Sequence, residues 1–265
     1  MAREKASRIT HNKNMKDKKI LIAGIILIIV IAVGTALYFF IAKDEAMLNH
    51  DLSKKENTEE QNLMQANQEA LAKAQESGST LRPADETDHI WGDLNAPVKM
   101  VVYSDFECPF CYDFHSTTQE IKDEFGDRVA VIFRHYFLSS HSNALLAAQA
   151  SECAGEQDKF WPMYDKLFED GRAGNLNMEE FKQDAEDLGL NQAKFNKCLD
   201  EEKYRDKILA QKQEGKEAGV IGTPTIFVGN EIYPGAYPFT DFTDSRGREV
   251  EGMRSVIERQ LGIVD

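Results

Sequence analysis

Cysteine is scarce in this sequence, and the few cysteines are unevenly spaced. The chain holds 4 cysteines in 265 residues. Only Cys108 and Cys111 lie close together, whereas Cys153 and Cys198 each stand alone. No second C-x-x-C or H-x-H motif is present to complete the four ligands of a structural zinc site. The shortage therefore argues against zinc at Cys108 and Cys111, and we expect the protein to bind no metal.

Basic residues are also fewer than acidic residues. Lys and Arg number 31 against 45 Asp and Glu, which leaves a net charge of −14. The first 19 residues hold seven basic and two acidic side chains, a charge of +5, so the rest of the chain carries −19. A strongly acidic surface disfavours binding to nucleic acid or to anionic lipid. We therefore expect no nucleic-acid partner.

Long apolar runs are absent except for one. Residues 20–42 form 23 consecutive positions without a charged side chain, enough at about 1.5 Å per residue to cross a hydrocarbon core of about 30 Å. A cleaved signal peptide is the alternative, but its apolar region is shorter and ends at a small-x-small site. We predict a single transmembrane anchor in the cell membrane. The basic residues before it place residues 1–19 in the cytoplasm and everything after Lys43 outside.

Aromatic residues are missing from the segment that follows. Residues 43–83 are rich in Glu, Gln, Asn, Lys and Ala and close on Ser77-Gly78-Ser79, a composition typical of a linker. Apolar residues recur on one helical face over part of the segment, so a helix or weak coiled coil is the alternative to a flexible stalk. We predict a stalk at 43–83 and one folded domain at 84–265.

The rest of the chain alternates between short apolar runs and helical patterns. The elements predicted in chain order are an edge strand at 88–92, a strand at 98–103, a helix to Phe125, a strand at 129–134, helices over 142–218 with N-caps at Asn177 and Asn191, strands at 225–228 and 231–233, a surface loop or hairpin at 237–252, and a helix at 253–261. The succession of strand, helix and strand over 98–134 predicts a parallel crossover unit.

The sequence Cys108-Pro109-Phe110-Cys111 lies between an apolar strand and the start of a helix. Pro109 suits the first helical position because its φ is already helical and no N–H is needed there, which makes Cys108 the predicted N-cap. The sulfur of an N-cap cysteine lies among unpaired N–H groups at the positive end of the helix dipole. Because this environment favours thiolate, the motif predicts thiol-disulfide exchange, with the Cys108–Cys111 disulfide in place of any cofactor.

A second motif, Gly222-Thr223-Pro224-Thr225, precedes an apolar strand, where proline either begins the strand or marks a cis peptide bond. Together with the C-x-x-C it makes residues 88–265 similar to the DsbA-like branch of the thioredoxin superfamily. The resemblance rests on the stretches 103–111, 159–161 and 219–228. It implies an α/β, thioredoxin-like fold, with a central mixed sheet flanked by helices and an inserted all-helical subdomain at about 141–218.

The resemblance also implies roles for individual residues. Cys108 would be the exposed attacking cysteine and Cys111 the buried resolving cysteine. In that family the Thr-Pro bond is cis and packs beside the active disulfide. Pro224 would therefore be the cis-proline, and Thr223 the residue that contacts the substrate backbone.

The residues around the cysteines bear on the acidity of Cys108. The central pair is Pro109-Phe110, so the histidine that strongly oxidising family members place there is absent, and Glu107 adds a negative charge beside the nucleophile. Both features raise the pKa of Cys108 relative to such members. We predict a pKa in the upper part of the range of about 3.5–7.5 found for activated cysteines.

The implied activity is that of a membrane-anchored, extracytoplasmic thiol:disulfide oxidoreductase. We expect an oxidase that forms disulfides in exported proteins and is reoxidised by a DsbB-like or VKOR-like membrane partner. A reductase or isomerase that uses the same residues is one alternative. A thioredoxin-fold module that binds partners or acts as a chaperone without turnover is another.

Cys153 and Cys198 both lie in the predicted helical insertion. In an oxidising compartment two free buried thiols are less favourable than one structural bridge, so we predict a Cys153–Cys198 disulfide. Two unpaired core thiols and an accessory redox pair are the alternatives.

Overall fold

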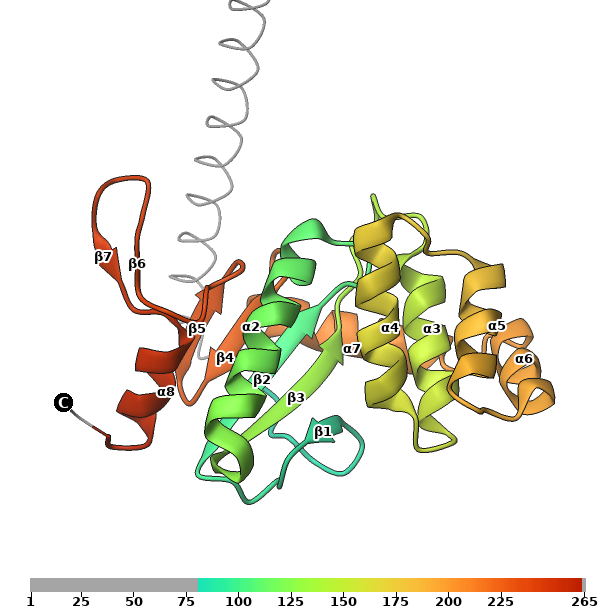
Figure 1. The fold of residues 1–265 in the computed structure, drawn as a ribbon, viewed down its shortest axis with the longest axis horizontal. Coiled ribbons are helices and arrows are strands. Elements are labelled where there is room, and N and C mark those ends of the chain that lie inside the picture. The colour runs from blue at the N-terminus through green and yellow to red at the C-terminus, as the bar shows by residue number, and fades with distance from the viewer. Residues whose placement is uncertain (1–80, 264–265) are drawn as a thin grey trace, which may run out of the picture. The chain divides into compact units, whose positions relative to one another are not determined.

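The computed structural model describes residues 81–263 (Figure 1). The predicted cytoplasmic tail, the transmembrane anchor and all of the stalk before Leu81 lie outside the described residues. Within 81–263, no helix has both the length and the apolar character needed to cross a bilayer.

Five strands form a mixed sheet in the order β1-β3-β2-β4-β5. The strands are β1 (His89–Trp91), β2 (Val98–Ser104), β3 (Val129–His135), β4 (Thr225–Val228) and β5 (Glu231–Pro234). β2 and β3 pair in parallel, and the other neighbouring strands pair antiparallel. Every residue of β3 is buried, as expected for a near-continuous apolar run covered on both faces. The predicted strands and the parallel crossover unit are confirmed.

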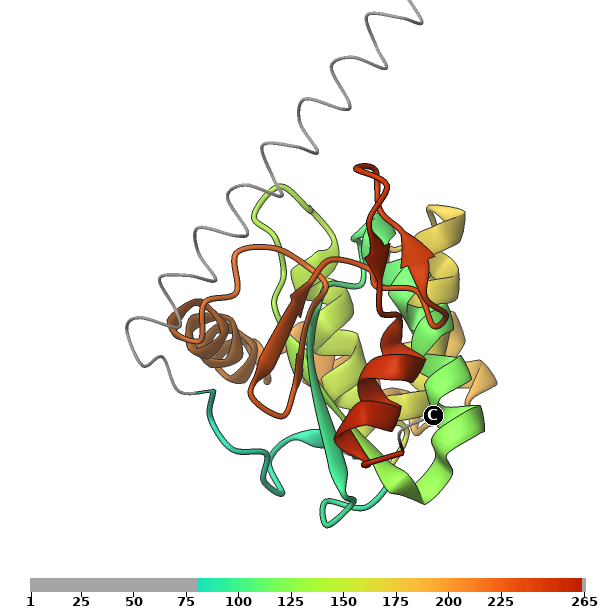
Figure 2. The same ribbon diagram turned by 90° about the vertical axis from the view of Figure 1, so that its left-hand side faces the viewer.

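Helices cover both faces of the sheet. Figure 2 shows α2 (Pro109–Phe125) and α8 (Met253–Gln260) on one side and α7 (Arg205–Glu217) on the other. A short 3-10 turn, η1 (Gly126–Arg128), links α2 to β3. Ile121 and Phe125 of α2 pack with Val131 and Ile226 of the sheet in one apolar cluster. The alternate strand residues, among them Val101, Ile132 and Phe227, belong to a second apolar cluster on the other face of the sheet. The sheet therefore separates two hydrophobic cores.

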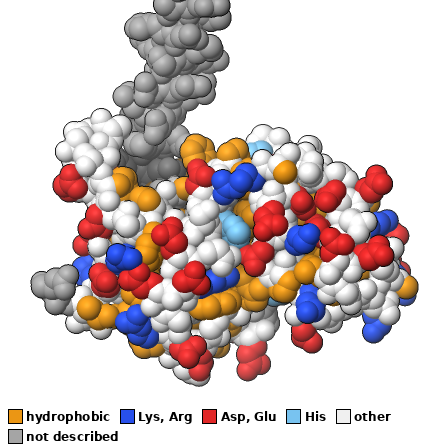
Figure 3. Space-filling model, viewed as in Figure 1, with side chains coloured by type: hydrophobic (Ala, Val, Ile, Leu, Met, Phe, Trp, Pro, Cys, Tyr) orange, Lys and Arg blue, Asp and Glu red, His pale blue; other side chains and the backbone are white. Residues whose placement is uncertain are grey.

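The insertion consists of four further helices, together with α7. They are α3 (Ala144–Gly155), α4 (Phe160–Ala173), α5 (Met178–Asp187) and α6 (Gln192–Asp200). Asn177 accepts hydrogen bonds from two N–H groups at the start of α5, and Asn191 accepts one at the start of α6, so both predicted N-caps are confirmed. A disulfide joins Cys153 of α3 to Cys198 of α6. On the face drawn in Figure 3, acidic side chains are intermingled with Lys and Arg.

The segment 237–252 forms a small antiparallel hairpin of β6 (Phe242–Thr243) and β7 (Glu249–Val250). The Asp244 carboxylate accepts hydrogen bonds from the backbone N–H groups of Arg246 and Arg248. It thereby closes the turn between the two strands. The predicted loop or hairpin is thus a hairpin.

Residues 81–83, assigned to the stalk by composition, contact the folded domain. The Arg82 guanidinium donates hydrogen bonds to Asp88 at 2.6 Å and to Glu214 at 3.0 Å. The Pro83 carbonyl accepts a hydrogen bond from Arg134 at 3.3 Å. The folded part of the chain therefore includes Leu81 and Arg82. Composition alone missed this, because Glu214 lies 132 residues further along the chain and meets Arg82 only in the folded domain.

We expect Arg82→Ala to lower the free energy of unfolding by about 1–2 kcal/mol. The change removes a charge-assisted hydrogen bond from Asp88, whose side chain is fully buried. Denaturant unfolding of the full chain measures the effect. Arg205→Ala is the control, because Arg205 is exposed and pairs with Glu202 only three residues away, so its loss should cost less than about 0.5 kcal/mol. Equal effects of the two changes would contradict the prediction.

Candidate active site

Cys108 lies between the end of β2 and the first residue of α2. Its backbone is extended (φ −85°, ψ 122°), and Pro109 occupies the first turn of the helix. The Cys108 carbonyl accepts hydrogen bonds from the N–H groups of Cys111 at 2.9 Å and Tyr112 at 3.2 Å. Cys108 is therefore the N-cap residue of α2, as predicted, and the Cys111 side chain lies one turn into the helix.

The segment with Thr223 and Pro224 reaches Cys108 through the register of the sheet. β4 pairs antiparallel with β2, and Tyr103 is opposite Thr225. The residues just before β4 are thus carried to the end of β2, where α2 begins. The Thr223–Pro224 peptide bond is cis, and the Cys108 thiol donates a hydrogen bond to the Thr223 carbonyl at 3.3 Å.

Both cysteines of the motif are free thiols and both are buried. Cys108 is 3% exposed and Cys111 is 1% exposed, so the expectation of an exposed Cys108 is wrong. Its sulfur is covered because it lies against the Thr223 backbone. The neighbouring Phe110 side chain is 57% exposed. A reacting molecule must therefore pass exposed neighbours such as Phe110 to reach the Cys108 sulfur, which does not lie on an open surface.

The two thiols have opposite acidities. The pKa of Cys108 is lowered to about 6 by a hydrogen bond from Cys111, against the opposing effect of burial. The Thr223 side chain and the N–H groups of Cys111 and Phe110 lower it further. This value lies in the upper half of the predicted range. Burial raises the pKa of Cys111 well above its ordinary value. At neutral pH the proton therefore stays on Cys111 and the negative charge on Cys108.

Glu107 has a different role from the one its position suggested. Its carboxylate accepts a hydrogen bond from the backbone N–H of Asn143 at 2.6 Å, and Asn143 is the N-cap residue of α3. The negative charge of Glu107 thus lies at the positive, N-terminal end of α3. The pKa of Cys108 is set mainly by Cys111, Thr223 and the helix start, not by Glu107.

Sequence reasoning missed Asp105, which organises the turn before Cys108. Its buried carboxylate accepts hydrogen bonds from the N–H of Glu107 at 2.8 Å and the N–H of Leu138 at 2.7 Å. It also contacts the His141 ring at 2.8 Å. These bonds tie the start of α2 to the loop between β3 and α3. The available signal was the Asp-x-Glu spacing, since Asp commonly accepts from the N–H two residues later.

The insertion packs directly against the active-site segment. The Phe168 ring of α4 lies 4.8 Å from that of Phe106 and stacks on His115 of α2 at 5.0 Å, measured between ring centroids. His115 also contacts Asp165 at 2.8 Å. His115 is therefore held in the interface between α2 and α4, one turn beyond Cys111.

A titration of thiolate absorbance should rise with a midpoint near pH 6, from the pKa of about 6 at Cys108. We expect Thr223→Val to shift this midpoint upward by about half to one pH unit, because valine keeps the shape but removes the hydroxyl that lowers the pKa of Cys108. Thr243→Val, on the exposed hairpin, is the control and should leave the midpoint unchanged. A wild-type midpoint above pH 8 would refute the assignment of Cys108 as the activated thiol.

Comparison with known proteins places this geometry among related folds. A family model described as thioredoxin matches residues 84–245. Alpha-DsbA1 from Wolbachia pipientis is 24% identical, with a TM-score of 0.55 over 69% of this chain and 96% of that chain. Oxidised BdbD from Bacillus subtilis is 23% identical, with a TM-score of 0.54 over 68% and 96%. A thioredoxin-like oxidoreductase from Silicibacter pomeroyi is 20% identical, with a TM-score of 0.54 over 67% and 92%. These likenesses establish the fold.

Curated relatives carry a different name. The Na(+)/H(+) antiporter NhaA 1 of Salinispora arenicola is 34% identical over 153 residues, which cover 57% of this chain and 23% of the antiporter. The protein of the same name from Mycobacterium sp. (strain KMS) is 35% identical over 167 residues, or 60% of this chain and 27% of the antiporter. The chain spans about a quarter of the length of these relatives, so their transport activity is not assigned to it.

Proposed function

The chain belongs to the thioredoxin family, and from this premise we propose that it is a thiol:disulfide oxidoreductase that reacts through Cys108 and Cys111. The observation that carries the proposal is the asymmetry of the two thiols. The pKa of Cys108 is lowered to about 6, whereas that of Cys111 is raised. The Cys108 sulfur can therefore attack or leave as a thiolate, whereas the Cys111 sulfur stays protonated as a thiol.

In the oxidising direction, the reaction starts from the Cys108–Cys111 disulfide. A substrate thiolate attacks the Cys108 sulfur, the bond to Cys111 breaks, and Cys111 leaves with the electron pair and takes up a proton. A second substrate thiolate then attacks the substrate sulfur of the mixed disulfide and expels Cys108 as thiolate. The substrate loses two electrons to the enzyme. The low pKa of Cys108 makes it a good leaving group in this second step.

The surroundings of the site suit an unfolded polypeptide as substrate. Phe110, 57% exposed, and Ile221, 40% exposed, each lie two residues from the Cys108–Thr223 contact. Large exposed apolar side chains near a reactive group favour contact with apolar partner segments. We propose that they bind segments of exported proteins next to a cysteine, and that the Thr223 backbone contacts the substrate chain.

We propose that the physiological direction is oxidation, at the outer face of the cell membrane. A pKa of about 6 lies between the values near 7 and near 3.5 that accompany reducing thioredoxin and strongly oxidising DsbA. Stabilising the thiolate stabilises the reduced form and so makes the disulfide more oxidising. Turnover then requires a membrane redox partner of the DsbB or VKOR type, and the apolar run at 20–42 is the proposed anchor beside it.

The reduction potential of the full-length protein, purified in detergent and equilibrated in glutathione buffers, tests the direction. We expect a value between those of thioredoxin, about −270 mV, and DsbA, about −120 mV. A value near that of thioredoxin would assign a reductase. Cys108→Ser is the control and should abolish the transition. The absence of any titratable pair in the wild type would instead favour a module that binds partners without turnover.

A further inference from the structure

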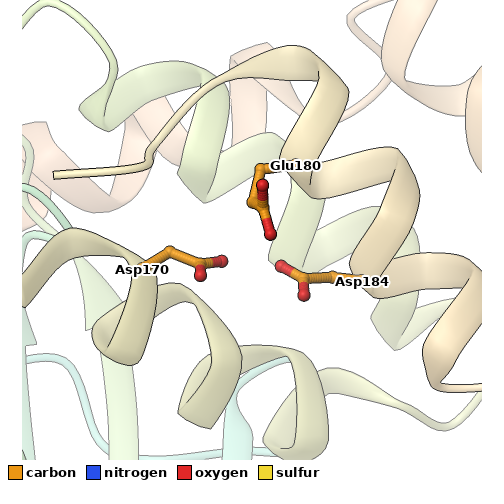
Figure 4. A group of neighbouring side chains, drawn as sticks. All are labelled: Asp170, Glu180 and Asp184. Carbon is orange, nitrogen blue, oxygen red and sulfur yellow. The ribbon is translucent and has the colours of Figure 1, made fainter. Parts of the chain in front are cut away.

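The helical insertion contains a group of acidic side chains that disulfide exchange does not use. Asp170 lies in the last turn of α4, and Glu180 and Asp184 lie on α5. Figure 4 shows the three carboxylates pointing toward one another between the two helices. One oxygen from each residue lies within 4.8 Å of the others. Asp184 is only 1% exposed, whereas Asp170 and Glu180 are half-buried.

Two of these carboxylates have buried oxygens that lack a hydrogen-bond donor. They are Oδ2 of Asp184 and Oδ2 of Asp170. The other oxygen of Asp184 pairs with the Lys166 ammonium at 3.3 Å, but Lys166 is shared with Asp187 at 3.5 Å. One ammonium thus serves two carboxylates of α5, and neither Oδ2 of Asp184 nor Oδ2 of Asp170 receives a donor. Buried carboxylate oxygens are costly unless a donor or a cation satisfies them.

The three carboxylates repel one another when all are charged, and protonation of one of them relieves this repulsion. Burial, the hydrogen bond that a protonated Asp170 can donate to Asp184, and the charges of Asp184 and Glu180 raise the pKa of Asp170 to about 7, while Lys166 acts in the opposite sense. Burial and the neighbouring carboxylates thus favour a positive charge between the three side chains.

We propose that Asp170, Glu180 and Asp184 form a binding site for a hard divalent cation, with Ca²⁺ as the preferred ion. The donor set consists only of carboxylate oxygens, which suit Ca²⁺, Mg²⁺ or Mn²⁺ and not zinc. Ca²⁺ binds oxygens at about 2.3–2.6 Å, so its ligands span up to about 5 Å, compared with about 4.2 Å around Mg²⁺. Water can complete the shell on the exposed side, at Asp170 and Glu180.

A cation at this site would fasten α5 to the helix that covers the active site. Asp170 is two residues after Phe168, whose ring contacts Phe106 and His115. The expected effect is therefore on the stability of the insertion and of its contact with α2. No step of thiol exchange passes through the ion, so this inference stands apart from the proposed function.

Thermal unfolding of the full-length protein in EDTA, CaCl₂ or MgCl₂ tests the site, together with calorimetric titration of Ca²⁺. At a hundredfold excess of Ca²⁺ over its dissociation constant we expect the melting temperature to rise by about 5–10 °C, and Mg²⁺ to have a smaller effect.

Variants separate this site from other sources of a calcium effect. Asp184→Asn should abolish the shift in melting temperature. Glu180→Gln, at a half-buried position that should tolerate the change, should weaken Ca²⁺ binding by about tenfold or more. Glu186→Gln is the matched control, because Glu186 is exposed on the same helix, and it should respond like the wild type.

Two results would overturn the proposal. No heat of binding and no shift in the wild type would mean that the carboxylates share only a proton, and an equal shift in Asp184→Asn would place the ion elsewhere. Cys108→Ser should keep the full response to Ca²⁺, so a failure of the redox proposal is distinguishable from a failure of this one.

Discussion

Cys108→Ser should reduce disulfide formation in a reduced, unfolded substrate protein by at least ~1,000-fold, to the rate without enzyme. A serine oxygen forms no disulfide, and its hydroxyl is not ionised at the helix start as the Cys108 thiol is. Mass spectrometry of the alkylated substrate measures the loss of free thiols over time. Because the sulfur of Cys108 is nearly buried, the substitution removes a reacting atom and alters little of the surface.

Cys111→Ser is the matched comparison, because it keeps the attacking thiol and removes the resolving one. Mixed with a substrate protein that carries a disulfide, this variant should accumulate a mixed disulfide, visible as a covalent complex on a non-reducing gel. The Cys108 thiolate attacks the substrate disulfide, one substrate sulfur leaves as thiolate, and no second enzyme thiol resolves the product. The serine hydroxyl can still donate to the Cys108 thiolate, so the pKa of Cys108 should remain depressed. Full activity of Cys108→Ser, or a covalent complex that survives in Cys108→Ser/Cys111→Ser, would contradict the assigned roles.

Loss of the Cys153–Cys198 disulfide should lower the free energy of unfolding by about 4 kcal/mol. The bridge joins α3 to α6 across a sequence separation of 45 residues, and closing a loop of that length restricts the unfolded chain by about this amount in the entropy model. The cleanest measurement uses Cys153→Ala/Cys198→Ala in a Cys108→Ser/Cys111→Ser background, where no other disulfide can form within one chain. Denaturant unfolding gives the difference.

Reduction supplies the control for this experiment. Dithiothreitol should destabilise the Cys108→Ser/Cys111→Ser protein by a similar amount and leave the fourfold variant unaffected. Peptide mass spectrometry without reduction should recover Cys153 and Cys198 in one linked pair. Recovery of both as free thiols from the oxidised protein, or insensitivity of its unfolding to reductant, would show that the pair is not a structural bridge.

Much of the fold and the chemistry of this protein is determined by its sequence, because the signals are local. An extended apolar run, a cysteine at an N-cap and a proline in the first turn fix a strand, a turn and a helix start within about a dozen residues. Asn177 and Asn191 begin their helices by accepting hydrogen bonds from neighbours two or three residues later. Strand, helix and thiol chemistry could therefore be assigned from the residues alone.

Tertiary structure decided the features that depend on residues far apart in the chain. The contact between Cys108 and Thr223 spans 115 residues and arises from the register of β2 and β4. The same contact buries the Cys108 sulfur, which no local pattern signals. Glu107 bonds to Asn143 instead of acting on its neighbour. Asp170 and Asp184 come together only because α4 packs on α5. Sequence periodicity specifies which face of an element is buried, but only packing specifies what that face meets.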